Sequence, residues 1–227
     1  MAAVIKRIHR TLRENGYNSD CRNWEELMKS TTILTLAVLS SLTGWVTSSA
    51  AQAVTEGKEK AAVCAGCHGE AGKGATPLFP KLAGQNFKYL SKQLRYFRDG
   101  TRSVPAMNAI AAGLTDDDIA ALSAYFEAQI PRPESGEASP EGERIYRSGI
   151  AEKNVPACGA CHGPEGQGNA PAGFPLLKGQ YAAYTVKALG DYAQGVRGEE
   201  KAPMRDIAAR MSEEEMKAVA AYIAVLK

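Results

Sequence analysis

The chain has 227 residues, with 27 Lys and Arg against 25 Asp and Glu, so its formal net charge is +2. So small an excess of positive charge argues against a protein that binds nucleic acid through a basic surface. Hydrophobic residues make up 44% of the sequence and charged residues 23%, which excludes a wholly disordered chain. Aromatic residues are only 7%, so a large aromatic core is not expected.

The N-terminal segment, residues 1–53, is predicted to lie outside the folded protein. Residues 30–55 contain no charged side chain, and the short apolar run 33–46 is followed by small residues up to Ala53. This pattern is typical of a secretory signal peptide that is cleaved after Ala53. The alternative is an uncleaved membrane anchor, but the run is shorter than the roughly 20 apolar residues of a spanning helix.

A signal peptide that begins at Met28 would be complete by itself. Met28 is therefore the predicted start, and residues 1–27 are interpreted as an upstream extension of the reading frame. The alternative is a genuine, extended n-region. Without residues 1–53 the chain has 21 basic and 21 acidic residues, four Cys and two His.

The remaining sequence is a tandem duplication. Residues 54–130 are predicted to form a first copy and residues 140–227 a second, joined by a linker of residues 131–139. The linker region is rich in Pro, Gly, Ser and Glu, as flexible connections are. The matching stretches are CAGCH (64–68) with CGACH (158–162), FPKLAGQ (79–85) with FPLLKGQ (174–180), and residues 105–126 with residues 202–223.

Each copy is predicted to be helical. Apolar residues recur at helical spacing from Phe87 to Phe97, and Gly100 then provides a natural helix end. Thr115 and Ser212 each open a capping box, in which the acidic residues that follow belong to the first turn of a helix. No run of alternating polarity predicts a strand, so the fold class is all-α.

The two C-x-x-C-H motifs predict covalent attachment of two haems c. Two Cys three residues apart share a helical face, where both sulfurs can react with the vinyl groups on one haem edge, and the adjacent His reaches the iron. A shared zinc site is disfavoured because the two motifs are 94 residues apart. A thioredoxin-like pair lacks its βαβ context, and a disulfide framework leaves the two His without a role. The predicted attachment and ligand residues are Cys64, Cys67, His68, Cys158, Cys161 and His162.

The second axial ligand of each iron is predicted to be a methionine, because residues 54–227 contain no other His. Met107 and Met204 occupy equivalent places, each after a Pro and before a helix, whereas Met211 and Met216 fall on apolar helix positions. A thioether opposite His raises the reduction potential of haem iron. Two filled axial positions also leave no place for a substrate, O₂ or peroxide.

Several other residues recur in both copies with two interpretations open. The carbonyls of Pro80 and Pro175 can accept a hydrogen bond from the ring of the nearby His, or these are ordinary turn prolines. Four polar residues can either meet haem propionates or form solvated surface. They are Gln85, Gln180, Arg102 and Arg197.

The paired C-x-x-C-H motifs, F-P-x-L-x-G-Q loops, late Met residues and A-x-Y-containing final helices resemble the cytochrome c4 family. The resemblance covers residues 54–227 and implies two tandem class I cytochrome c domains related by approximate twofold symmetry. It further implies a periplasmic electron carrier between a cytochrome bc complex, or another respiratory donor, and a terminal oxidase. Members of this family are often loosely associated with the membrane.

Two other functions remain open beside that of a carrier without enzymatic activity. The chain could instead be the cytochrome subunit of an oxidoreductase, such as a flavocytochrome c sulfide dehydrogenase. A two-haem peroxidase needs one open iron site, which two matched Met ligands would close.

The signal-peptide interpretation predicts the N-terminus of the exported protein. N-terminal sequencing of protein isolated from its natural host should begin at or next to Val54. A mature protein that still carries residues 1–27 would contradict both the cleavage and the start at Met28.

Overall fold

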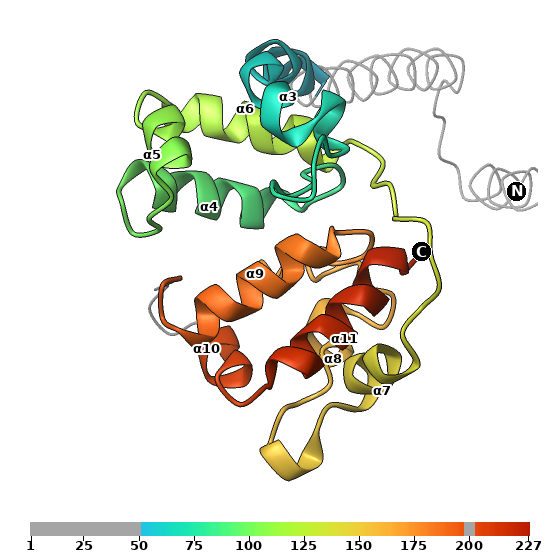
Figure 1. Ribbon diagram of the computed structural model, residues 1–227. Helices are drawn as coiled ribbons and strands as arrows, with labels where there is room; N and C mark the ends of the chain where they lie inside the picture. The colour runs from blue at the N-terminus through green and yellow to red at the C-terminus, as the bar shows by residue number, and fades with distance from the viewer. Residues whose placement is uncertain (1–50, 198–202) are drawn as a thin grey trace, which may run out of the picture. The chain divides into compact units, whose positions relative to one another are not determined.

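The structure, a computed structural model, describes residues 51–197 and 203–227 (Figure 1). The predicted extension and nearly all of the predicted signal peptide lie outside these residues. The described part is helical, and its only β-type pairings are two isolated bridges, Ile150 with Val155 and Asn169 with Phe174. None of the helices described is long and apolar enough to cross a membrane.

Both copies have the same helical plan. In the first copy residues 51–60 are helical and lead into α3. The elements that follow are α3 (Ala62–His68), η1 (Glu70–Gly72), α4 (Phe87–Arg98), α5 (Pro105–Ala111) and α6 (Asp116–Glu127). Those of the second copy are α7 (Pro140–Ser148), η2 (Ala151–Lys153), α8 (Gly159–His162), α9 (Ala182–Ala193), α10 (Pro203–Ala208) and α11 (Glu213–Val225).

The starts of the last helices follow the predicted capping boxes. The Thr115 side chain accepts a hydrogen bond from the backbone of Asp118, whose carboxylate accepts from the backbone of Thr115. Ser212 and Glu215 repeat this exchange at α11. The acidic triplets therefore cap helices, where negative charge is favoured.

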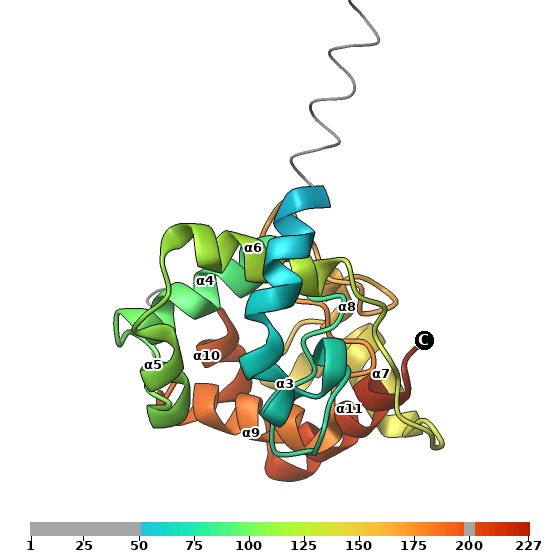
Figure 2. The same cartoon turned by 90° about the horizontal axis from the view of Figure 1, so that it is seen from above.

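In each copy a glycine lies where two helices cross with their backbones close together. A Cβ placed on Gly57 would lie 2.1 Å from the Ala121 carbonyl oxygen of α6, and one on Gly142 of α7 would lie 2.0 Å from that of Ala218 in α11. In Figure 2 the helical stretch that leads into α3 crosses α6. Only a residue without a side chain permits this approach of two backbones.

The second copy carries an insertion that the alignment of the motifs does not show. Six residues lie between Gly57 and Cys64, but fifteen lie between the structurally equivalent Gly142 and Cys158. The nine extra residues form η2 and a loop that the Ile150–Val155 bridge closes.

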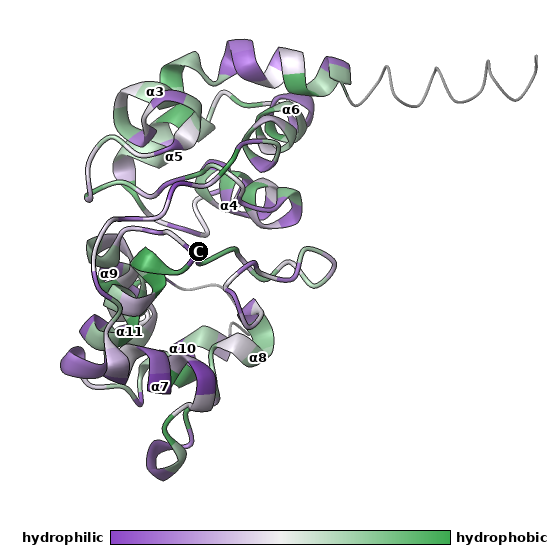
Figure 3. Ribbon diagram, turned by 90° about the vertical axis from the view of Figure 1, so that its right-hand side faces the viewer, coloured by the Kyte–Doolittle hydropathy of each residue, from purple (hydrophilic) through white to green (hydrophobic). Residues whose placement is uncertain are grey.

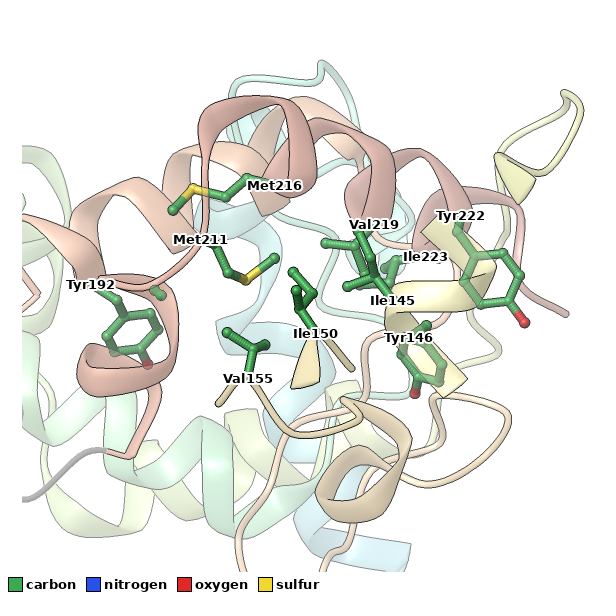
Figure 4. Close-up of a cluster of buried hydrophobic side chains, with 11 residues drawn as sticks. Ile145, Tyr146, Ile150, Val155, Tyr192, Met211, Met216, Val219, Tyr222 and Ile223 are labelled. Carbon is green, nitrogen blue, oxygen red and sulfur yellow. The ribbon is translucent and has the colours of Figure 1, made fainter. Parts of the chain in front are cut away.

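Each copy has its own apolar core. In the second copy α7 contributes Ile145 and Tyr146, both fully buried, and α11 contributes Val219 and Ile223 (Figure 4). Figure 3 shows α7 mostly in hydrophilic colours, which agrees with the burial of a single face of this helix. The smaller core of the first copy consists of Ala61, Leu90, Leu122, Tyr125 and Phe126.

The linker is fastened to the second copy. The backbone N–H of Glu134 donates to the Ala224 carbonyl at 2.8 Å, and the Glu134 carboxylate accepts from the backbone of Ala182. The Lys81 ammonium of the first copy donates to the Arg132 carbonyl at 2.7 Å. These bonds hold the segment between α6 and α7 along its path.

The close helix crossing at Gly142 predicts that adding one methyl group there lowers the stability of the protein. Gly142→Ala should destabilise the protein by about 1–3 kcal/mol, because α7 and α11 must move apart. Gly190→Ala in α9 is a matched control, since a Cβ there meets nothing within 4 Å, and it should be neutral or slightly stabilising. Thermal unfolding followed by far-UV circular dichroism measures both. Equal stability of the two variants would show that the crossing is not tight.

Candidate haem sites

The first C-x-x-C-H motif lies on α3 and the loop that follows it. Cys64 is half-buried, Cys67 is exposed, and His68 at the end of α3 is buried. Gly69 then ends the helix with a φ of 77°, a backbone conformation that favours glycine. The chain thereby turns directly after His68 and brings residues 79–81 back beneath it.

The ring of His68 is fixed by the loop below it. Its Nδ1 lies 2.7 Å from the carbonyl oxygen of Pro80, and the edge of Phe79 packs against it with 6.2 Å between ring centroids. A carbonyl can only accept a hydrogen bond, so Nδ1 carries the proton and donates. Nε2 therefore keeps its lone pair, which is the state in which an imidazole binds a metal.

The second motif repeats this arrangement on a shorter helix. Cys158 is the N-cap of α8, and His162 is buried at the end of that helix. The Nδ1 of His162 lies 3.0 Å from the Pro175 carbonyl oxygen, with Phe174 beside the ring. The hydrogen bonds confirm the first interpretation of Pro80 and Pro175, as carbonyl partners of the two His.

Burial determines the protonation of both sites. Burial lowers the pKa of His68 and of His162, and the hydrogen bonds to the proline carbonyls offset only part of this. Both imidazoles are therefore neutral at neutral pH. Burial also raises the pKa of the Cys64 thiol, and that of Cys158 to about 11.

The candidate methionines lie in corresponding places of the two copies. Met107 is in α5, which begins at Pro105, and Met204 is in α10, which begins at Pro203. Both side chains are partly buried. Met216 belongs to the core of the second copy (Figure 4). Met211 also belongs to that core, but it borders the haem-site cavity as well.

One cavity of about 590 Å³ connects the two sites. Apolar side chains from both copies line most of it, such as Leu90, Phe97 and Leu177. All eight residues predicted from the sequence border this cavity: Cys64, Cys67, His68, Met107, Cys158, Cys161, His162 and Met204. A set of paired thiols, one neutral imidazole and one thioether in each copy, within an apolar cavity, fits haem c.

Two buried arginines from different copies meet at this cavity. Arg102 donates to the Gln93 side chain at 2.6 Å and to the Tyr184 hydroxyl at 3.3 Å. Arg197 donates to the same Gln93 oxygen at 3.0 Å and to the Tyr89 hydroxyl at 2.7 Å. Each arginine thus bonds the tyrosine of the other copy.

The arginines are not solvated surface, since they are only 9% and 4% exposed. Their charges also act on the neighbouring phenol. Burial acts to raise the pKa of the Tyr184 hydroxyl, but the guanidinium charges of Arg102 and Arg197 outweigh it and lower that pKa. The two guanidiniums therefore favour negative charge on groups beside them in the cavity.

Gln85 and Gln180 are also buried, at 5% and 9% exposure, and each reaches into the other copy. Gln180 bonds the backbone of Lys81, and Gln85 bonds the backbone of Leu176. Neither of the two sequence interpretations, propionate partner or solvated surface, describes these contacts. Their repetition in both copies was the only signal in the sequence, and it did not show what they bind.

A buried lysine is a further feature that sequence reasoning missed. Lys81 is 9% exposed, and its ammonium donates to the carbonyls of Arg132 and Gly179, both at 2.7 Å, and lies over the Tyr181 ring. Burial lowers the pKa of this ammonium. Its equivalent in the second copy is Leu176, so the contact between the copies departs from symmetry here.

Two helical domains, each with a C-x-x-C-H motif and a proline carbonyl under its His, define a two-domain class I cytochrome c. The cytochrome c family profile matches residues 54–128 and 141–227. The chain belongs to the cytochrome c4 family, whose members bind two haems c and transfer electrons.

The similarity to this family extends over most of the chain. The chain is 40% identical to cytochrome c4 of Azotobacter vinelandii, over 84% of this chain and 96% of that protein. It is 43% identical to the thiosulfate dehydrogenase electron acceptor of Stutzerimonas stutzeri, over 72% and 79%. The crystal structure of reduced cytochrome c4 from Pseudomonas stutzeri matches with a TM-score of 0.72 and 38% identity, over 75% of this chain and 97% of that chain.

Proposed function

We propose that each C-x-x-C-H motif binds one haem c through two thioether bonds. Cys64 and Cys67 would hold the first haem, and Cys158 and Cys161 the second. The pairs support this role because each lies beside a buried, neutral His whose Nε2 is left free to ligate iron. When bound, haem c supplies a one-electron Fe(III)/Fe(II) couple.

Met107 and Met204 are the proposed second axial ligands. Each borders the cavity that His68 and His162 border, and each lies in the first turn of a helix that begins with a proline. Met211 borders the cavity too, but its counterpart in the first copy is Leu114, which cannot ligate iron. The shared arrangement of the two copies therefore supports Met204.

Arg102 and Arg197 are the proposed partners of the haem propionates. Their guanidiniums are buried and border the cavity, where they could donate to carboxylates. Charge-assisted hydrogen bonds from buried arginines are the strong kind. The Tyr184 hydroxyl accepts a hydrogen bond from Arg102, and the Tyr89 hydroxyl accepts one from Arg197.

The function supported best is that of an electron carrier without enzymatic activity. The observation that supports it is that a buried His and a Met of each copy border one apolar cavity. With these proposed ligands, each iron would have no open position for a substrate. The buried His are held by hydrogen bonds, so the sites need little rearrangement when an electron arrives or leaves. The proposed route runs in the periplasm, from a cytochrome bc complex or another respiratory donor to a terminal oxidase, with loose association at the membrane.

A second candidate function concerns sulfur oxidation. The relatives named thiosulfate dehydrogenase electron acceptor, and a structural match to thiosulfate dehydrogenase from Marichromatium purpuratum at 38% identity, favour a dehydrogenase as donor. That structure is longer, since the chain covers 40% of it. The same relatives also favour the alternative from the sequence, in which the chain is the cytochrome subunit of an oxidoreductase, such as a flavocytochrome c sulfide dehydrogenase.

Rapid mixing distinguishes the two donors. The oxidised protein is mixed with reduced cytochrome bc complex, or with thiosulfate dehydrogenase and thiosulfate, and haem reduction is followed by absorbance. Reduction faster by tenfold or more with the first donor supports the respiratory route, and the reverse supports the sulfur route. Slow reduction by both would contradict both assignments.

Covalent attachment predicts a definite mass. Under denaturing conditions the intact protein should have the mass of the polypeptide plus two haems, and Cys64→Ala with Cys67→Ala should lose one of them. The double variant Cys158→Ala and Cys161→Ala should lose the other. A native protein that carries zinc and no haem would refute the proposal.

The axial ligands predict separate effects of three methionines. Met107→Ala or Met204→Ala should let cyanide or imidazole bind that iron, and should lower its potential on the order of 0.1 V or more, since axial ligands set haem potentials over about 0.8 V. Met211→Ala should lower stability and leave ligation intact. Spectroelectrochemistry and the absorbance band of the Fe–Met bond report both effects. Loss of ligation in Met211→Ala, with Met204→Ala unaffected, would reverse the assignment.

A further inference from the structure

A chain of two hydrogen bonds runs from His68 into the second copy. The Nδ1–H of His68 donates to the Pro80 carbonyl at 2.7 Å, and the N–H of Lys81 donates to the side-chain oxygen of Gln180 at 2.9 Å. The Pro80 carbonyl and the Lys81 N–H are the two ends of a single peptide group. One amide unit therefore connects the ring of His68 to a glutamine of the other copy.

The same chain exists in the opposite direction. The Nδ1–H of His162 donates to the Pro175 carbonyl at 3.0 Å, and the N–H of Leu176 donates to the side-chain oxygen of Gln85 at 2.8 Å. Each copy thus supplies the glutamine that bonds the peptide group under the other copy's His.

Each glutamine is held at both ends of its amide. The nitrogen of Gln180 donates to the Lys81 carbonyl at 2.9 Å, and the nitrogen of Gln85 donates to the Leu176 carbonyl at 2.9 Å. These donor bonds determine which atom of each side chain is oxygen. Because both side chains are also buried, their oxygens stay on the N–H groups of the two peptide units.

A hydrogen bond to the N–H of a peptide group changes the acceptor strength of its carbonyl oxygen. An acceptor on the N–H draws electron density toward the carbonyl oxygen, so the carbonyl becomes a stronger acceptor, and hydrogen bonds in such chains reinforce one another. A stronger acceptor at Nδ1 makes the imidazole a better electron donor to a metal at Nε2. A better donor stabilises the oxidised metal and so lowers its reduction potential.

We propose that Gln180 and Gln85 are positioning residues that set, from the opposite copy, the potential of each haem. Gln180 acts on the haem of residues 64–68 through Lys81 and Pro80, and Gln85 acts on the haem of residues 158–162 through Leu176 and Pro175. The inference rests on the proposed axial roles of the two His. It makes each haem's potential depend on contact between the copies.

Two single substitutions test the crossed relation. Gln180→Met and Gln85→Met keep the approximate side-chain volume and remove both hydrogen bonds to the other copy, together with the bond from the next residue's backbone N–H. Gln180→Met should raise the potential of the first-copy haem and leave the second unchanged, and Gln85→Met should do the reverse. Potentiometric titration gives the two potentials, and the haem methyl signals in the NMR spectrum assign each to its copy.

Asn86→Ala is the matched control for a loosened contact between the copies. Its side chain donates across the same contact to the Phe174 carbonyl at 2.7 Å, but that carbonyl is not part of the peptide group bonded to His162. Both potentials should therefore stay at the wild-type values. A shift equal to that of the Gln variants would mean that the glutamines act only by holding the copies together, and would overturn the proposal.

A second measurement does not depend on the potentials. Exchange of the His68 Nδ1 proton with solvent, followed by NMR, should be several-fold faster in Gln180→Met than in the wild type, and unchanged for His162. Gln180→Glu keeps an oxygen that accepts from the Lys81 N–H, so it should retain the slow exchange. If Gln180→Met fails to fold, Gln180→Glu still tests the proposal, because fast exchange of the His68 Nδ1 proton in this variant would contradict the chain of hydrogen bonds.

A shift confined to the glutamine's own copy, an equal shift in both haems, or no shift in either would overturn the inference. Such results in a protein that carries two Met-ligated haems would leave the proposed function intact. Failure of the wild-type protein to attach haem would instead refute the proposed function, and the mass measurement detects that independently.

Discussion

The hydrogen bond from each buried His to a proline carbonyl is the interaction on which the rest of the site depends. It fixes the proton on Nδ1, leaves the lone pair of Nε2 free, and restrains the orientation of the ring. The glycine after each His turns the chain so that the proline loop can return beneath the ring. The contact between the copies then acts on this same loop, through Gln180 on one side and Gln85 on the other.

Reciprocity distinguishes this contact from ordinary domain packing. Both the glutamines and the arginine–tyrosine pairs exchange between the copies, so each copy completes the surroundings of the other's site. Single chemical differences break the symmetry at defined places. Lys81 aligns with Leu176 of the second copy. Gln93, whose side-chain oxygen accepts hydrogen bonds from both arginines, aligns with Ala188. Two sites of one ancestry are thereby placed in different electrostatic surroundings, which is a physical basis for unequal potentials in one carrier.

Much of the fold follows from local patterns. Thr115 and Ser212 begin their helices because the capping box satisfies orphan N–H groups within a single turn, and such a signal needs no tertiary contact. The burial of Ile119 and Val219 follows equally from helical periodicity. The insertion that forms η2 could not be recognised from the sequence motifs, because it lies before the second C-x-x-C-H motif, outside the stretches that align. Only the equivalent helix crossings at Gly57 and Gly142 show that these two residues correspond.

The sequence by itself determined the all-helical class, the duplication and the cofactor. The cofactor could be predicted because the spacing within C-x-x-C-H is enough to bring its reactive side chains together. It also predicted the eight site residues, and all of them border one cavity. Only the tertiary structure decided what the polar residues shared by both copies do. Gln85 lies 91 residues from the peptide group that it bonds, and Gln180 lies 99 residues from its own. No local pattern specifies such a partner, because it depends on how the two copies pack against each other.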